Sequence, residues 1–272
     1  MTRPATVLLS IVLFYSLVTT AAADELAKAA RDVVRQHADA VVTLKLVIEE
    51  SMSFGEFEED ESVGTLEITA TIITPDGLIV TSLAQTDPAG MFDSLFESME
   101  DDDFSFSIET DITDVRVLLS DGKEIPAKIV LRDRDLDLVF LRPEKPLKQP
   151  LPFIDLARSA TARQFDPLIT LRRLGKVANR QCTASFPRVQ AVMKRPRLMY
   201  VLESEFGSGL GLPAFSTTGD CIGITVLRSL NLPISDSMAI FSDSSFNIAT
   251  IVLPASDILE IAEQAVETAD SN

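Results

Sequence analysis

The sequence contains one histidine, His37, no tryptophan, two cysteines and 6% aromatic residues among its 272 residues. A single imidazole and the absence of a C-x-x-C pair argue against a zinc site, and we expect neither a metal nor a cofactor. Without tryptophan, the core must be built from Val, Ile, Leu and Phe. His37 ends the segment 24–38, whose apolar spacing predicts a short helix, and we expect an exposed or capping side chain there.

The two cysteines, Cys182 and Cys221, leave two interpretations open. They could form one disulfide in an oxidising compartment, or they could be two buried free thiols. Their spacing alone does not decide between these states.

No apolar run is long enough to cross a membrane. A spanning helix needs about 20 apolar residues, whereas the run 7–18 holds about a dozen. It follows Arg3 and precedes the small residues 21–23, as in a cleaved secretory signal. We expect residues 1–23 to be removed, and the mature chain to be periplasmic or secreted with no membrane anchor.

Positive charge is scarce and unevenly placed. The net charge is −17, and residues 49–114 hold 19 Asp and Glu with no Lys or Arg. A chain this acidic is repelled by nucleic acid and by anionic membranes, so we expect no nucleic-acid partner. We interpret 49–62 and 85–113 as long solvated loops. Two further readings are docking of a basic partner and Ca²⁺ binding, although neither loop has the spacing of a helix-loop-helix calcium site.

Short β-branched segments separated by turn residues dominate the rest of the chain. About twelve strands, few helices and the proline-rich stretch 143–152 predict an all-β fold of two antiparallel six-stranded β-barrels with short N- and C-terminal helices. We place the first barrel and N-terminal helix in 24–145, and the second barrel and C-terminal helix in 146–272.

Five segments in a fixed order resemble motifs of one protein family. Residues 74–81 read T-P-D-G-L-I-V-T, and residues 219–224 read G-D-C-I-G-I. The other three segments are 117–130, 133–141 and 251–254 followed by a helix. Together they resemble the HtrA-type trypsin-like serine proteases over residues 29–268. The resemblance implies the double barrel, although the PDZ domain usual in that family is not expected here.

The residues at the family's catalytic positions differ from the family's pattern. The histidine position falls on Ala84, the aspartate position on Asp137, and the serine position on Leu210 within S-G-L-G-L-P. A register shifted by two would make Ser208 the nucleophile, but it loses the match at Pro213 and supplies no histidine. Asp137 is either a relic carboxylate without its imidazole or an aspartate bonded to backbone N–H groups.

The resemblance and these substitutions favour a non-catalytic protease homologue that binds polypeptide or an envelope protein. In the family a peptide adds as a strand beside the active-site cleft. The expected cleft residues here are Leu210, Leu212, Gly223, Ile224 and Thr225. The alternative is a residual serine endopeptidase using Ser208, and a third hypothesis is docking of a basic partner on the acidic segments. A homo-oligomer is compatible with the sequence, which identifies neither the partner nor the process.

Overall fold

The computed structural model describes residues 25–54, 57–87, 106–203, 209–229 and 248–270. Six strands form a closed barrel, the first barrel, in the order β1-β2-β3-β6-β5-β4. Their bounds are β1 Val41–Phe54, β2 Phe57–Ile72, β3 Ile79–Ser82, β4 Phe106–Leu118, β5 Glu124–Asp133 and β6 Leu138–Pro143. All pairings are antiparallel, as predicted.

The remaining seven strands form a curled half-barrel, the second sheet, in the order β8-β7-β11-β12-β13-β10-β9. They are β7 Ile169–Arg173, β8 Cys182–Ser185, β9 Val189–Met193, β10 Met199–Leu202, β11 Pro213–Phe215, β12 Cys221–Ser229 and β13 Ile248–Pro254. The predicted all-β architecture of two antiparallel units is confirmed, and the second unit differs from the predicted six-stranded barrel in having seven strands and an open sheet. Pro187 lies between β8 and β9 and has no N–H to donate, which favours a break in the ladder there.

The segment before β7 nevertheless approaches the other end of the second sheet at β9. Leu168 N–H donates to the Pro187 carbonyl at 2.9 Å, and Phe165 N–H donates to the Val189 carbonyl at 2.7 Å. These bonds join the segment before β7 to the start of β9, so the sheet curls around a core of its own.

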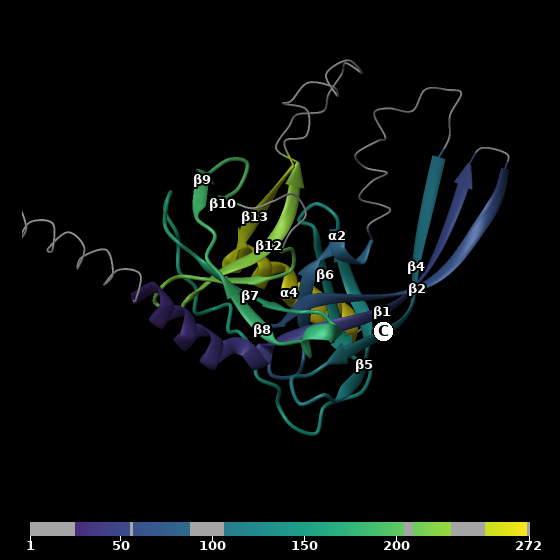
Figure 1. The fold of residues 1–272 in the computed structure, drawn as a ribbon, viewed down its shortest axis with the longest axis horizontal. Coiled ribbons are helices and arrows are strands. Elements are labelled where there is room, and N and C mark those ends of the chain that lie inside the picture. Colours follow the sequence, from purple (N-terminus) through teal and green to yellow (C-terminus); the bar gives the residue numbers. More distant parts are fainter. Residues whose placement is uncertain (1–24, 55–56, 88–105, 204–208, 230–247, 271–272) are drawn as a thin grey trace, which may run out of the picture.

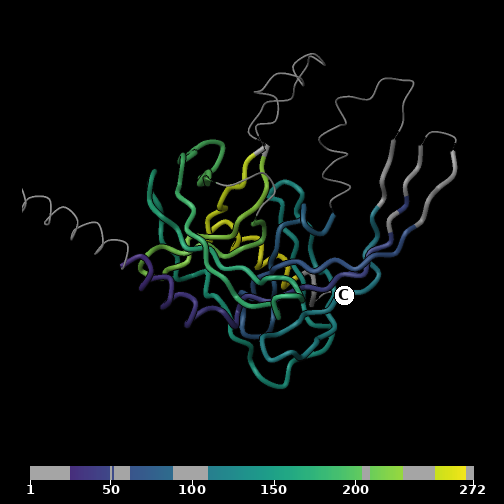
Figure 2. Tube along the Cα trace, in the orientation of Figure 1, coloured from purple at the N-terminus to yellow at the C-terminus, as the bar shows by residue number. Residues whose placement is uncertain are grey.

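The acidic segments are strands rather than the predicted loops. β1 and β2 pair up to Phe54 and Phe57, and β4 pairs with β1 from Phe106 onward. We call the outer part of these strands the arm: residues 48–54, 57–64 and 106–112. Figures 1 and 2 show the three strands leaving the first barrel side by side. Residues 88–105 of the second predicted loop lie outside the described residues.

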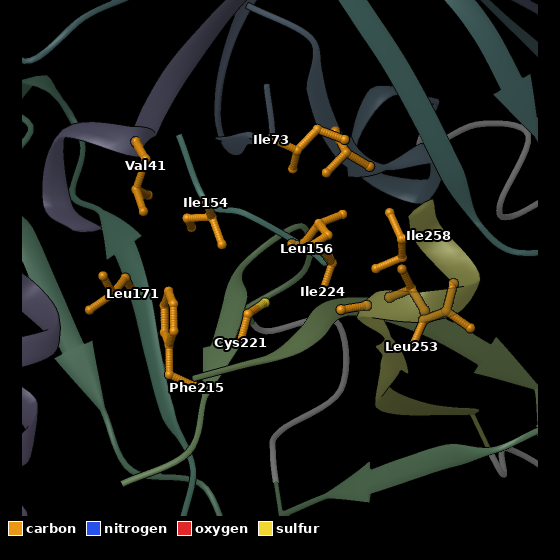
Figure 3. Packing of buried hydrophobic residues seen from close by; sticks show 14 of the residues in the cluster. Val41, Ile73, Ile154, Leu156, Leu171, Phe215, Cys221, Ile224, Leu253 and Ile258 are labelled. Atoms are coloured by element: carbon orange, nitrogen blue, oxygen red, sulfur yellow. The ribbon is translucent and has the colours of Figure 1, made fainter. Parts of the chain in front are cut away.

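The largest apolar cluster lies between the two β units rather than inside either one. Figure 3 shows Val41 and Ile73 of the first barrel facing Leu171, Phe215 and other side chains of the second sheet. The connection between the units contributes Ile154 and Leu156, both buried. Separate clusters fill the first barrel and the second sheet. Burial at the junction therefore fixes the two units against each other.

Both predicted terminal helices are present. The N-terminal helix covers 25–37 and buries Ala30 and Val33, and a single turn of 3-10 helix, η1 (Ala38–Ala40), follows it. The C-terminal helix α4 (Ala255–Asp270) buries Ile258, Ala262 and Ala265 at the spacing of one helical face. Two short helices complete the described elements: α2 (Leu83–Thr86) and the 3-10 turn η3 (Lys176–Ala178).

No helix in the described part of the chain is long and apolar enough to span a membrane.

Arg173, at the end of β7, joins the second sheet to the first barrel. Its guanidinium donates to the carbonyls of Val41 at 2.7 Å and Ala38 at 2.6 Å. Its backbone N–H donates to the Thr69 hydroxyl at 3.2 Å. Nearby, Arg180 forms a bidentate ion pair with Glu67 of β2. These polar contacts fix the orientation of units that the apolar cluster brings together.

The two cysteines are free and buried, so the structure agrees with two buried thiols rather than with a disulfide. Cys182 lies on β8 and Cys221 on β12, with β7 and β11 between them. Three strand spacings correspond to about 14 Å along the sheet, too far for a disulfide. Burial raises the pKa of the Cys221 thiol to about 12, and such a thiol is unreactive near neutral pH.

His37 is packed against the second sheet, in contrast to the exposed or capping position that we expected. Its ring stacks on Phe215 with centroids 4.7 Å apart and planes inclined by 19°. Its Nε2 is buried and has no hydrogen-bond partner in the described part of the chain. Burial lowers the pKa of His37, and the charge of Arg158 adds to this, while a hydrogen bond with the Gly219 backbone opposes it.

The lowered pKa of His37 predicts a loss of stability in mild acid. The unfolded chain binds a proton near pH 6.5, while the folded chain resists protonation, so stability decreases as pH falls through about 6.5. His37→Phe keeps the stacking and removes the titration. We expect its melting temperature to fall less than that of the wild type between pH 7.5 and pH 5.5. Carboxylates titrate in both proteins, so parallel pH curves would contradict this account.

Candidate functional site

Asp137 lies at the junction of the two β units, in the turn before β6. Its carboxylate accepts three hydrogen bonds, from the Ser82 hydroxyl at 2.5 Å, the Ala84 N–H at 2.7 Å and the Leu227 N–H at 2.7 Å. Ser82 and Ala84 belong to the first barrel, whereas Leu227 lies on β12. Of the two sequence interpretations, the structure matches an aspartate bonded to backbone N–H groups.

The environment of Asp137 acts on its pKa in two directions. Burial raises the pKa of the carboxyl, while hydrogen bonds from Ser82, Leu227 and Ala84 and the charge of Arg228 oppose the rise. The net direction is upward. The backbone of Asp137 has a φ of 56°, a conformation that aspartate tolerates better than most residues. The chain thus keeps a poorly solvated carboxyl on a residue with a left-handed backbone conformation.

Ala84 is the residue that the sequence resemblance assigns to the histidine position. It lies on α2, directly after β3, and its N–H rather than its side chain contacts Asp137. The methyl group can neither accept nor donate a proton. The chain's histidine, His37, contacts Phe215 instead, and none of the hydrogen bonds to Asp137 involves it.

Leu210, which the sequence resemblance assigns to the serine position, is 5% exposed. Its neighbours Gly209 and Gly211 have φ values of 71° and 68°, which fold the loop back onto β12. Gly211 N–H donates to the Thr225 carbonyl at 2.7 Å, and Thr225 N–H donates to the Leu212 carbonyl at 2.9 Å. The alternative nucleophile Ser208 lies outside the described residues.

The loop 209–212 lies directly against the elements that flank Ala84. A Cβ on Gly211 would be 2.1 Å from the Thr81 hydroxyl and 2.6 Å from the Gln85 amide nitrogen. The three positions Ala84, Asp137 and Leu210 therefore lie in one region, as the resemblance implied. Sequence reasoning missed Ser82 and Leu227 as partners of Asp137, because no motif marks the N–H of a distant strand.

The five residues expected to line a cleft are brought together and buried. Leu212 is 4% exposed, and Ile224 and Thr225 are almost fully covered, as are Leu210 and Gly223. The loop 209–212 already uses both backbone groups of Thr225. A peptide strand could add to β12 at Thr225 only by displacing this loop. Peptide binding by these residues remains a prediction.

Within the described residues, no group of three or more His, Cys, Asp or Glu side chains is placed to hold a metal ion. The hydrogen-bonding groups around Asp137 are N–H and O–H donors. Such a shell suits an anion, here the carboxylate itself. The site as described consists of the Asp137 carboxylate, held by three donors, and the apolar side chains of Ala84 and Leu210 in the same region.

Comparison with known proteins identifies the fold. No family model and no curated protein matches the sequence. Among solved structures, the chain is similar to the HtrA-type protease AlgW with a decapeptide, with a TM-score of 0.54 and 19% identity. The match covers 88% of this chain and 67% of that chain. At this identity the similarity establishes the trypsin-like double-barrel fold, in which the second unit is here a curled half-barrel.

Gly223, one of the predicted cleft residues, lies where the packing of β12 against β13 leaves no room for a side chain. A Cβ there would lie 1.8 Å from the Leu253 carbonyl oxygen on β13, so the strands would have to separate. We expect Gly223→Ala to lower the free energy of unfolding by about 3 kcal/mol or more. The matched control is Gly64→Ala on β2, whose Cβ would meet Ile48 at an ordinary 3.5 Å. Urea unfolding of both variants measures the difference, and equal effects would contradict the packing argument.

Proposed function

We propose that this chain is a non-catalytic homologue of the trypsin-like proteases that binds polypeptide outside the cytoplasm. The observation that carries the proposal is the bonding of Asp137. In a serine protease this carboxylate orients an imidazole that takes the serine proton. Here the same carboxylate accepts hydrogen bonds from the Ala84 N–H, the Leu227 N–H and the Ser82 hydroxyl.

The chemistry of peptide-bond hydrolysis supports this reading. Acyl transfer needs a nucleophile, a base within hydrogen-bond reach of it and donors for the oxyanion. The nucleophile position carries the buried Leu210, and the base position carries Ala84. The N–H groups of Gly211 and Leu212 donate to the carbonyl and hydroxyl of Thr225. Both groups belong to the loop that follows the nucleophile position, and these bonds hold that loop closed against β12.

Polypeptide binding is supported by the fold and by the similar structure. That HtrA-type protease was solved with a decapeptide. A double barrel offers strand edges for main-chain pairing, which does not depend on a triad. Binding at Thr225 would require displacement of loop 209–212, so the protein would bind polypeptide through movement of that loop or through another edge.

The proposed location outside the cytoplasm rests on residues 1–23, which have the features of a secretory signal. After their removal, the chain would begin at Asp24 and be periplasmic or secreted. The structure describes residues from 25 onward, so this part of the proposal depends on the sequence.

Cleavage of denatured casein tests the absence of catalysis. The purified chain from Asp24 onward is compared with its Ser208→Ala variant, with an active trypsin-like protease as positive control. We expect no cleavage by either form, because the described residues of the site include neither a base nor a nucleophile. Cleavage by the wild type that disappears in Ser208→Ala would overturn the proposal and establish the residual endopeptidase instead.

A further inference from the structure

A surface pocket of about 580 Å³ lies beside β5 and β6, between the turn 74–77 and the proline-rich segment 143–150. Small-molecule sites in proteins commonly have volumes of about 300–1,000 Å³. The residues that line this pocket include neither Ala84 nor Asp137 nor any residue of loop 209–212. The pocket is therefore separate from the candidate site, and we call it the proline pocket.

Backbone hydrogen bonds hold the walls of the proline pocket in place. Leu151 N–H donates to the Pro75 carbonyl at 2.9 Å, which ties the end of the proline-rich segment to the turn. Glu144 N–H donates to the Pro126 carbonyl at 3.0 Å, which ties the beginning of the segment to β5. The prolines within the segment restrict its backbone further. The walls are thus formed before a ligand arrives, which lowers the entropic cost of binding.

Part of the wall is apolar. Pro143 and Leu147 both line the pocket, and both pack against the turn at Gly77. A Cβ on Gly77 would lie 3.0 Å from the Pro143 ring and 3.1 Å from a Leu147 methyl group. Pro143 and Leu147 are nevertheless only partly buried. They therefore keep apolar surface that a ligand can contact.

Two positive side chains face each other at the pocket. Lys128 on β5 lies directly opposite Arg142 on β6, and both line the pocket. Like charges directly opposite each other destabilise a sheet. Asp76 compensates Arg142, whose guanidinium donates to one oxygen of its carboxylate. The other oxygen accepts a hydrogen bond from the Thr74 hydroxyl. Asp76 is thus engaged by groups other than Lys128.

The two lysines of the pocket lack such a partner. Among the described residues, neither the Lys128 ammonium nor the Lys145 ammonium forms an ion pair. Glu144 also lines the pocket, and its charge acts on Arg116, whose pKa is raised first by the hydrogen bond with Asp114 and further by Glu144. The lining holds three cations and two carboxylates, in a chain whose net charge is −17. The excess of one positive charge attracts a monovalent anion.

We propose that the proline pocket binds an organic monocarboxylate with an apolar body. Lys128 and Lys145 pair with the carboxylate, and Pro143 and Leu147 contact the apolar part. One excess positive charge suits a carboxylate better than a dianionic phosphate. This group occurs in small free acids and at the C-terminus of a polypeptide that ends in an apolar residue. The inference goes beyond the proposed function, because it needs neither the predicted cleft nor the absence of catalysis.

The competing explanation is that the hollow is only a by-product of a proline-rich connection that crosses the surface. Such a hollow would not distinguish an acid from its amide. A binding site would prefer the acid, because the amide keeps the shape of the ligand and removes its charge.

The test is an NMR titration of the ¹⁵N-labelled chain from Asp24 onward. The first pair of probes is N-acetyl-leucine and its amide. The second pair is the acetylated peptide Ala-Ala-Ala-Leu with a free or an amidated C-terminus. The first protein variant is Lys128→Gln with Lys145→Gln, and Leu147→Ala shortens the apolar wall. The matched control is Lys176→Gln with Lys194→Gln, which removes two exposed lysines from the second unit.

We expect both acids to bind saturably with a Kd of about 1 mM or lower, and both amides to bind at least about tenfold more weakly. The Lys128/Lys145 variant should weaken binding of the acids about fivefold and Leu147→Ala about threefold, with the control variant within about twofold of wild type.

The two acids also separate the sources of the carboxylate. Similar affinities would support a small free acid, and much tighter binding of the peptide would support a polypeptide C-terminus. Absence of saturable binding, equal binding of an acid and its amide, or equal effects of the two double-lysine variants would each overturn the proposal. Casein cleavage is a separate readout, so failure here leaves the proposed absence of catalysis standing.

Discussion

The carboxylate of Asp137 connects the two halves of this molecule at a single buried point. Two of its hydrogen-bond donors belong to the segment 82–84 of the first barrel, and the third belongs to β12 of the second sheet. A buried carboxylate is tolerated when donors converge on it, and it becomes costly when a donor is lost. Here the carboxylate accepts hydrogen bonds from two main-chain N–H groups and from the Ser82 hydroxyl.

The surroundings of Asp137 are consistent with this structural use. The loop 209–212 closes over β12 and fits tightly against Thr81 and Gln85 at Gly211. Arg173 and the shared apolar cluster fix the same junction from other sides. With the junction filled in this way, the fold itself covers the described residues of the predicted cleft.

Much of the fold could be predicted from local pattern. Turns such as 74–77, the β-branched strands and the apolar face of α4 are local features, and the structure confirms them. The extent of β1, β2 and β4 could not be predicted, because acidic segments read as solvated loops. Their strand structure depends on long-range register, for example between Ser51 and Glu109. The break between β8 and β9 at Pro187 could not be predicted either, because it depends on which strands pair in the second sheet.

The candidate site could also be predicted only in part from the sequence. Motif order placed Ala84, Asp137 and Leu210 in one region, because the strands that carry them keep a fixed order in the fold. The partners of Asp137 come from residues 53, 55 and 90 positions away. Two of them are backbone N–H groups that every residue except proline carries. Burial of the predicted cleft followed from the backbone of loop 209–212, whose path depends on contacts with Thr81 and Thr225.

The most direct test of the structural role of Asp137 is the free energy of unfolding of Asp137→Asn, measured in urea beside Ser82→Ala. Asparagine would turn an N–H donor toward at least one of the convergent donors. We predict a loss of about 2–4 kcal/mol for Asp137→Asn and about 1 kcal/mol for Ser82→Ala. An Asp137→Asn variant as stable as the wild type would contradict the account, because the carboxylate would then not be what joins the two units.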